Sequence, residues 1–222
     1  MFGKNPLRPP ESGDGSLLQV VNIFPTLQGE GPFVGHPAVF VRLGGCNLAC
    51  SFCDTEFEAF APLALSDLLA QLNALRQPGR DLVVITGGEP LRQNIAPLCE
   101  ALLAQGWRVQ IETNGTLWRP LPDAVSIVCS PKMTAGSYHS LRPDVLARVD
   151  ALKFIVAAAP GDYHSVGNVG QHESGRAIPV YVQPMDAYDM TLNAANTAHA
   201  LALAQAHGYR LSLQTHKLLG IA

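Results

Sequence analysis

Three cysteines in the segment GGCNLACSFCDT, residues 44–55, have a spacing that can support metal chemistry. Cys46, Cys50 and Cys53 follow the pattern C-x3-C-x2-C. Three thiolates on a tight loop can bind three irons of a [4Fe-4S] cluster, and the missing fourth ligand leaves one iron open to an exogenous chelator. S-adenosylmethionine has an amino group and a carboxylate that can chelate this iron, and it supplies radical chemistry once the cluster delivers an electron. The spacing therefore predicts a cluster loop.

A zinc site is the alternative for the same loop. Zinc needs four ligands, so His36 or Asp54 would have to complete the set. The chain has five cysteines, an odd count that disulfides explain poorly and that favours a reducing compartment. We interpret the two remaining thiols, Cys99 and Cys129, as small buried residues in apolar surroundings.

The segment ITGGEP, residues 85–90, is the second motif with chemical potential. Its two glycines allow backbone groups to approach a ligand closely, and Pro90 closes the turn. Alone, such a turn could simply connect a strand to a helix. In this sequence the turn follows the cysteines by one predicted helix and one predicted strand. In that position it resembles the element that contacts the methionine amino group in radical S-adenosylmethionine (SAM) enzymes. The pairing of the two motifs indicates this class.

Short apolar runs rich in β-branched residues predict the strands that must position these motifs. They lie within residues 17–24, 38–43, 81–86, 107–113, 125–130, 151–156, 178–183 and 210–214. Helical patterns cover residues 66–77, 93–105 and 191–207, with Ser66 and Thr191 as N-caps and Pro97 tolerated only in a first turn. This alternation predicts an α/β fold with a mainly parallel sheet. We expect an incomplete, open (β/α) barrel of the radical SAM type, with its site after the carboxyl ends of the strands.

Composition limits the kind of partner. The chain has 222 residues, of which 47% are hydrophobic and 15% charged, and its net charge is −3. This balance indicates no nucleic-acid partner, and no apolar run approaches the roughly 18 residues that a membrane span needs. We expect a cytoplasmic protein that acts on a small molecule, with a flexible extension at residues 1–15 and a single domain at residues 16–222.

Six segments carry a closer resemblance. They are TLQGEGPFVGHPAVFVRLGGCNLACSFCDT, VVITGGEP, IETNGT, SPK, VQPM and LQTHKLLGIA, and they occur in the order seen in 7-carboxy-7-deazaguanine synthases. The resemblance implies a lyase that converts 6-carboxy-5,6,7,8-tetrahydropterin to 7-carboxy-7-deazaguanine with release of ammonia, in queuosine and deazapurine biosynthesis. It also implies a [4Fe-4S] cluster, catalytic use of SAM, Mg²⁺, an electron donor such as flavodoxin or ferredoxin, and a homodimer.

The same resemblance implies a set of site residues. The pterin substrate would contact Leu27, Gln28, Gly29, Glu30, Arg42, Thr86 and the terminal carboxylate of Ala222. The cofactor would contact Phe52, Asp54, Gly88, Ser130, Pro131, Lys132, Gln183, Pro184, Met185 and Asp186. The cluster ligands would be Cys46, Cys50 and Cys53, and Thr55 would bind Mg²⁺ through its hydroxyl. Glu112 and Asn114, which follow a similar strand end, are reserve candidates.

Elementary chemistry agrees with several of these roles. The fork of the Arg42 guanidinium suits the substrate carboxylate, and a hydroxyl oxygen at Thr55 suits a hard cation. The alternatives are that Thr55 caps a helix and that Lys132 is a solvated surface lysine. The apolar end of the chain predicts a docked tail in which Leu218, Leu219 and Ile221 are buried.

Two other functions remain open at this stage. A glycyl-radical activating enzyme would use the same cysteine spacing but act on a protein. A non-catalytic iron-sulfur or zinc module would bind its metal without cleaving SAM.

Overall fold

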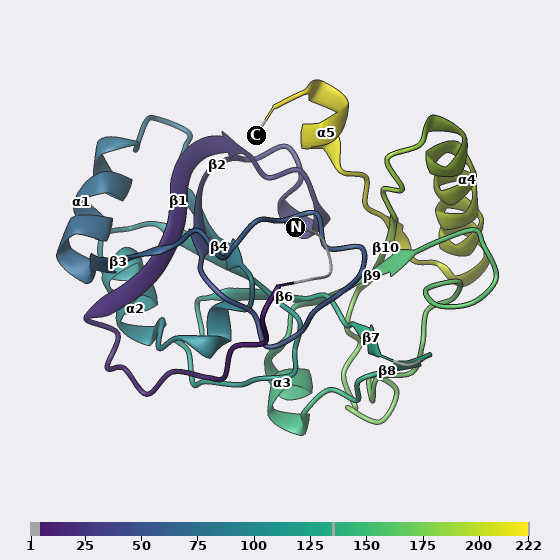
Figure 1. Cartoon of the computed structure of the whole chain (residues 1–222), viewed down its shortest axis with the longest axis horizontal. Helices are drawn as coiled ribbons and strands as arrows, with labels where there is room; N and C mark the ends of the chain where they lie inside the picture. The colour runs from purple at the N-terminus through teal and green to yellow at the C-terminus, as the bar shows by residue number, and fades with distance from the viewer. Residues whose placement is uncertain (1–4, 135, 222) are drawn as a thin grey trace.

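The computed structural model describes residues 5–134 and 136–221. Within these residues a nine-stranded sheet has the order β11-β10-β9-β6-β5-β4-β2-β1-β3 (Figure 1). Its strands are β1 Leu17–Leu27, β2 Pro37–Leu43, β3 Ala61–Ala64, β4 Leu82–Gly87, β5 Arg108–Thr113, β6 Ser126–Cys129, β9 Ala151–Val156, β10 Val180–Pro184 and β11 Arg210–Leu211. A separate hairpin pairs β7 Met133–Thr134 with β8 Ser137–Tyr138.

Helices cover the outside of the sheet, except for the last one in the chain. They are α1 Leu65–Ala74, α2 Ala96–Ala104, α3 Pro143–Arg148, α4 Met190–His207 and α5 Thr215–Leu219, with 3₁₀ turns η1 Gly31–Phe33 and η2 Pro90–Arg92. Figure 1 shows α1 and α2 beside the first strands and α4 at the far end beside β9 and β10. No helix of the described residues is long and apolar enough to cross a membrane.

Strand direction confirms the predicted fold class. β2, β4, β5, β6, β9, β10 and β11 run parallel to one another, whereas β1 is antiparallel to both β2 and β3. Each parallel crossover returns the chain to the end of the sheet where the previous strand began. The carboxyl ends of these strands therefore share one end of an open, incomplete (β/α) barrel.

Every predicted strand is present, but two predicted helix caps are wrong. Helix α1 begins at Leu65 after Ala64, which makes no side-chain cap, so Ser66 lies inside the helix. The cap of α4 is Asp189 rather than Thr191, because the Asp189 carboxylate accepts a hydrogen bond from Leu192 N at 2.9 Å. Pro97 lies in the first turn of α2, as required.

The two faces of the parallel sheet differ in character. Val83 and Ile85 of β4 are fully buried in the main hydrophobic cluster with residues of α1 and α2. Leu82 and Val84 point to the inner face, where they form a small separate cluster near the amino ends of the strands. Further along, the same inner face becomes polar and carries Arg42, Thr86, Glu112, Lys153 and Gln183. The alternation of the strands therefore places a polar site inside the carboxyl end of the barrel.

The end of the chain is held by polar contacts, so the prediction of a buried apolar tail is wrong. Leu218, Leu219 and Ile221 are 73%, 62% and 39% exposed. The N–H and hydroxyl of Thr215 instead both donate to the Gly29 carbonyl at 3.1 Å. Helix α5 turns its polar residues toward the barrel, which leaves its leucines outside.

The start of the chain runs along the barrel. Leu7 forms a bridge with Cys46, and Glu11 N donates to the Arg92 carbonyl at 2.8 Å. That residues 1–15 form a flexible extension stays a prediction, and residues 1–4 lie outside the described part of the chain.

The close approach of β4 to β2 can be tested at Gly87. This residue has a φ of +135°, and a Cβ atom there would lie 2.1 Å from the Leu43 carbonyl oxygen. Gly79 has a φ of +80° but nothing within 4 Å of its Cβ position. We expect Gly87→Ala to lower the free energy of unfolding by roughly 3 kcal/mol or more, and Gly79→Ala by about 1 kcal/mol. Denaturant titration measures both values, and equal losses would refute a steric constraint at Gly87.

Candidate functional site

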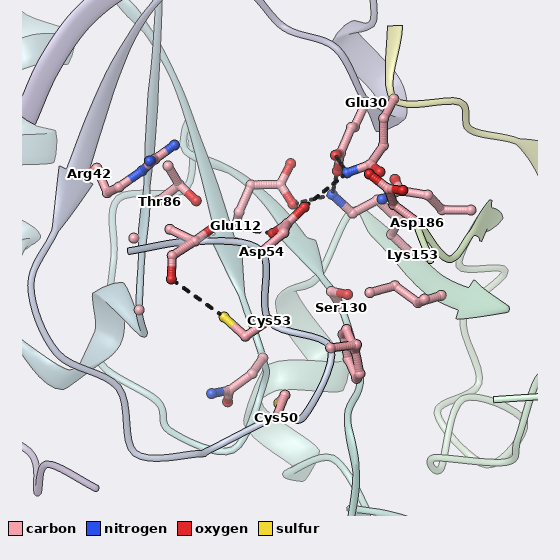
Figure 2. Close-up of a pocket in the computed structure, with 18 of the residues that line it drawn as sticks. Glu30, Arg42, Cys50, Cys53, Asp54, Thr86, Glu112, Ser130, Lys153 and Asp186 are labelled. Carbon is pink, nitrogen blue, oxygen red and sulfur yellow. Dashed lines mark hydrogen bonds and ion pairs between the residues drawn. The ribbon is translucent and has the colours of Figure 1, made fainter. Parts of the chain in front are cut away.

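A pocket of about 330 Å³ opens at the carboxyl ends of the parallel strands (Figure 2). Its walls include most of the residues that the sequence predicts: Leu27, Gln28, Glu30, Arg42, Cys46, Cys50, Phe52, Cys53, Asp54, Thr55, Thr86, Gly88, Ser130, Lys132, Gln183, Pro184, Met185 and Asp186. The reserve candidates Glu112 and Asn114 also line it. Gly29 and Pro131 lie next to lining residues but are not part of the wall, and Ala222 is outside the described residues.

The three cysteines lie on the loop between β2 and β3. A turn holds the loop, since Cys53 N donates to the Cys50 carbonyl at 3.1 Å, and Leu48 N points to Cys46 Sγ at 3.4 Å. Burial raises the pKa of all three thiols, that of Cys46 to about 12. A bound metal would have to offset this cost, because the thiolate is the form that binds.

The donor set fits a cluster better than a single ion. Among the described residues, no group of three or more His, Cys, Asp or Glu side chains could hold one metal ion. A zinc site needs four ligands around one ion, whereas a cubane cluster takes each thiolate on a different iron. Cys99 and Cys129 are completely buried in the main hydrophobic cluster, which confirms that they pack as small apolar residues.

The GGEP turn touches the cluster loop through the backbone. Glu89 N donates to the Gly45 carbonyl at 3.0 Å, and Gly88 N donates to the Leu43 carbonyl at 3.2 Å. A Cβ at Gly88 would lie 2.1 Å from Gly45 O, so no larger residue fits this contact. The two motifs that lie far apart in the sequence therefore form one unit.

The carboxylate of Glu89 is fully buried and is not part of the pocket wall. It accepts hydrogen bonds from Leu91 N at 2.9 Å, Thr113 Oγ1 at 2.8 Å and Asn114 N at 2.8 Å. Asn114 in turn donates through Nδ2 to Asn47 Oδ1 on the cluster loop at 3.0 Å. Glu89 thus ties the turn after β4 to the turn after β5, which supports the cluster loop from below.

Arg42 carries an unused donor in the pocket wall. Its guanidinium lies 5.5 Å from the ring centroid of Phe24, and its strand register places it beside Thr86, as Figure 2 shows. The Nε atom is buried and has no hydrogen-bond partner among the described residues. Burial lowers the pKa of Arg42, although Asp54 and Cys53 oppose the shift. A charged donor without a partner fits an anionic ligand group.

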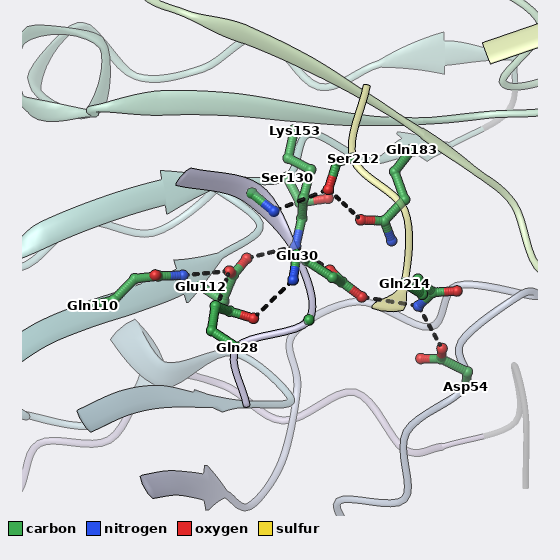
Figure 3. Close-up of polar contacts among 12 residues, drawn as sticks. Gln28, Glu30, Asp54, Gln110, Glu112, Ser130, Lys153, Gln183, Ser212 and Gln214 are labelled. Atoms are coloured by element: carbon green, nitrogen blue, oxygen red, sulfur yellow. Dashed lines mark hydrogen bonds and ion pairs between the residues drawn. The ribbon is translucent and has the colours of Figure 1, made fainter. Parts of the chain in front are cut away.

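A buried ion triad forms the deepest polar part of the site (Figure 3). The ammonium of Lys153 on β9 contacts Glu30 Oε2 and lies 2.8 Å from Glu112 Oε2 on β5. Amides complete the set: Gln214 Nε2 donates to Glu30 Oε1 at 2.9 Å and Gln110 Nε2 to Glu112 Oε1 at 2.6 Å. The triad joins three separate segments, and Gln214 adds a fourth from near the end of the chain.

The members of this triad titrate differently. Burial alone would raise the pKa of Glu30, but the Lys153 ammonium and the Gln214 amide lower it to about 2. Burial raises the pKa of Glu112, because Lys153 opposes the rise only in part and Glu30 adds to it. Burial would lower the pKa of Lys153, but the two carboxylates raise it above its usual value. Lys153 therefore stays charged.

Helix α5 closes the pocket rim with a second shared cation. Lys217 Nζ lies 2.8 Å from both Asp54 Oδ2 and Asp186 Oδ2, and so links the cluster loop to the end of β10. His216 lines the pocket beside it, and burial lowers the pKa of its imidazole. These contacts place α5 over residues that the resemblance assigns to cofactor and substrate.

Two alternatives from the sequence are wrong. Lys132 is not a solvated surface lysine, since it lines the pocket and donates to Ser130 Oγ at 2.6 Å and to Ser130 O at 3.0 Å. Thr55 caps no helix, because it lies in an irregular segment well before α1. Its hydroxyl donates to Asp54 Oδ1 at 3.2 Å.

Sequence reasoning missed several pocket residues, namely Lys153, Gln214, His216, Lys217 and the nearby Tyr163. Tyr163 packs edge-on against Phe52, with ring centroids 4.9 Å apart. The sequence did contain a sign that Lys153 is a site residue. A lysine at an inner-face position of the apolar strand ALKFIV cannot reach solvent, so it needs a buried partner. The others lie in loops or a short helix, where no periodic pattern marks them.

The fold and the site together define a radical SAM protein. An open barrel carries a C-x3-C-x2-C loop in contact with a GGEP turn, and the family model of the radical SAM superfamily matches residues 40–161. Enzymes of this class use a [4Fe-4S] cluster and SAM.

Similar proteins identify the family of this chain within the radical SAM class. A 7-carboxy-7-deazaguanine synthase from Rickettsia prowazekii is 53% identical over 100% of this chain and 96% of the relative. One from Rhodospirillum rubrum is 48% identical over 100% of both chains. The crystal structure of QueE from Escherichia coli has a TM-score of 0.72 and 25% identity, covering 91% of this chain and 99% of that chain. The chain belongs to the 7-carboxy-7-deazaguanine synthase family.

The triad predicts a pH-dependent stability defect. Lys153→Met leaves two buried carboxylates without a cation, and we expect a loss of about 3–5 kcal/mol at neutral pH. Without Lys153 the pKa of the folded-state carboxyls rises above the unfolded value of about 4.3, so protonation on acidification favours the folded variant. The loss should therefore shrink as the pH falls from neutral toward that value.

Lys217→Met is the matched control, because Lys217 also bridges two carboxylates but its side chain is 32% exposed rather than 6%. We expect it to cost less than about 1 kcal/mol. Urea unfolding at several pH values measures both variants. A Lys153→Met defect that did not change with pH would contradict the assignment of the triad.

Proposed function

We propose that this chain is a 7-carboxy-7-deazaguanine synthase, a radical SAM lyase that converts 6-carboxy-5,6,7,8-tetrahydropterin to 7-carboxy-7-deazaguanine with release of ammonia. One observation carries the proposal: the three cluster cysteines line the same pocket as Arg42, whose Nε has no hydrogen-bond partner within residues 5–134 and 136–221. A redox centre and a carboxylate-binding donor are therefore within reach of one small molecule.

The cofactor end of the pocket is the cluster loop and the strand ends beside it. Cys46, Cys50 and Cys53 would hold the cluster, which with SAM supplies the radical chemistry when bound. Backbone at Gly88 can approach the cofactor because it has no Cβ. The further cofactor contacts would be Phe52, Asp54, Ser130, Pro131, Lys132, Gln183, Pro184, Met185 and Asp186, all but Pro131 in the pocket wall.

The substrate end is the inner face of β2, β4 and the turn after β1. Arg42 would bind the substrate carboxylate through parallel N–H donors, and Thr86 lies beside it in register. Leu27, Gln28, Gly29 and Glu30 would contact the pterin ring, whose N–H groups suit carboxylate and amide acceptors. By the resemblance, the terminal carboxylate of Ala222, which lies outside the described residues, would add another acceptor.

Further properties belong to the same proposal. Thr55 would be the protein ligand of Mg²⁺, since a hydroxyl oxygen suits a hard cation and leaves room for substrate and water. The site draws on segments from Leu27 to Lys217, which supports a single radical SAM domain at residues 16–222. We also propose a homodimer that takes electrons from a flavodoxin or ferredoxin and works in the cytoplasm, where thiols stay reduced.

Anaerobic reconstitution followed by turnover tests this function. The loaded protein should bind about four irons per chain and cleave SAM. It should form 7-carboxy-7-deazaguanine from the carboxytetrahydropterin, faster with Mg²⁺ than without it. Iron uptake without SAM cleavage would favour a non-catalytic module, and SAM cleavage that ignores the pterin would favour an activating enzyme.

The cysteines should divide into two groups. We expect Cys46→Ala, Cys50→Ala and Cys53→Ala each to abolish SAM cleavage, because three thiolates are the minimum that leaves one iron open. Cys99→Ala and Cys129→Ala should retain it, since both thiols are completely buried and neither lines the pocket. Assays of SAM cleavage by the reconstituted variants measure this difference. Full activity in any of the first three variants would contradict the assignment of these cysteines as cluster ligands.

Arg42→Lys should raise the substrate KM by about tenfold or more, because a point charge cannot replace a bidentate fork. The affinity for SAM should change little. Arg108→Lys is the matched control: Arg108 also stacks on an aromatic ring, Phe33, at 4.6 Å, but lies outside the pocket. Steady-state kinetics of the parent and the two variants measure the substrate KM. Equal KM values would show that Arg42 does not bind the substrate.

A further inference from the structure

The N-terminal segment at residues 5–11, here called the N-terminal brace, is hydrogen-bonded to the cluster loop. Arg8 N donates to the Cys46 carbonyl at 2.8 Å, and Asn5 Nδ2 donates to the Leu48 carbonyl at 3.1 Å. Leu7 and Cys46 form a parallel bridge. The brace thus holds the backbone of the first cluster cysteine.

The Arg8 side chain ties the start of the loop to the segment that follows it. Its Nε and one terminal nitrogen donate to Glu58 Oε2 at 2.9 and 2.6 Å. Its guanidinium lies 5.0 Å from the ring centroid of Phe60, and that ring occupies the place of any side chain at Gly44. Arg8 therefore joins both ends of the loop that carries the three cysteines.

Gly45 lies between the brace and the GGEP turn. A Cβ atom at Gly45 would be 2.7 Å from Arg8 Cδ and 2.9 Å from Arg92 Nε. The carbonyl of Gly45 accepts the hydrogen bond from Glu89 N at 3.0 Å. Because Gly45 is enclosed from two sides, the Arg8 stem limits how far the cluster loop can move from the GGEP turn.

The far end of the brace is fixed to the barrel. Arg92, whose side chain is 3% exposed, donates to the Pro9 carbonyl at 2.6 Å and to Glu11 Oε1 at 2.8 Å. The Glu11 carbonyl also accepts from Arg119. Pro9 and the neighbouring Pro10 restrict the backbone, which lowers the entropy cost of holding the segment in place.

We propose that the N-terminal brace positions the cluster loop and that Arg8 is its principal positioning residue. The proposal rests on the cluster of the proposed function but concerns residues outside the motifs of that function. Partners that orient metal ligands from behind typically change metal retention when they are removed. Arg8 acts through the loop backbone and is not part of the pocket wall.

Four variants, one of them a matched control, test the brace. Arg8→Ala removes the ion pair and the stem beside Gly45, and Arg8→Lys keeps a cation and most of the stem. Arg76→Ala is the matched control, because Arg76 also stacks on a ring, Trp107 at 4.6 Å, and donates to two backbone carbonyls, those of Gln105 and Gly106. Glu58→Gln removes the same ion pair from the other side should Arg8→Ala fail to fold.

Two readouts separate positioning from general stability. The first is the rate at which the loaded protein loses iron to a chelator. The second is the rate at which iodoacetamide alkylates Cys46 in cluster-free protein, measured by mass spectrometry, with Cys129 as an internal reference because it is completely buried. Thermal unfolding of each variant records its general stability.

We expect Arg8→Ala to lose iron about tenfold faster than the parent, the lower end of what loss of an orienting partner costs. Alkylation of Cys46 should also accelerate, Arg8→Lys should restore most of both rates, and Arg76→Ala should match the parent. If Arg8→Ala behaves like Arg76→Ala in both readouts, the brace does not position the loop. A parent that takes up no cluster would refute the proposed function instead, and the alkylation rates alone would then decide the brace.

Discussion

The backbone contact between Gly45 and Gly88 is the constraint on which the rest of the site depends. It exists because β2 and β4 are neighbours in the sheet, so that the loops after them leave the barrel side by side. Neither glycine can carry a side chain without a clash. The cysteines, the GGEP turn and Arg42 then share one pocket, since all of them follow or end the same two strands.

The pocket combines two environments with opposite electrostatic demands. The cluster loop is half-buried, and burial raises the pKa of its thiols although the Lys132 ammonium opposes the rise at Cys50, so the thiols resist ionisation until a metal binds. The deep wall holds Lys153 between two carboxylates, which keeps their charges in place at a desolvation cost. Charged groups held in fixed positions can orient a polar ring without reorganising. A pocket with thiols at one end and fixed charges at the other suits a substrate that must meet a radical source at one end only.

Segments near both ends of the chain contact the site. Residues 5–11 are hydrogen-bonded to the cluster loop, and α5 covers the pocket rim through Lys217, with the neighbouring Gln214 bound to Glu30. Both contacts use polar groups on segments with little apolar burial. Hydrogen bonds and ion pairs therefore hold both segments against the site.

The sequence by itself determined the strands, the cluster loop, the GGEP turn and the position of Arg42. These features depend on local spacing and period, which a linear reading captures. Only the tertiary structure decided the Lys153 triad, the polar docking of α5 and the contact of residues 5–11 with Cys46. Glu30, Glu112 and Lys153 come from three separate segments, and no local pattern encodes which inner-face charges will meet. The orientation of α5 likewise followed from partners at Gly29 and Asp186, far away in sequence, which outweighed the apolar character of its leucines.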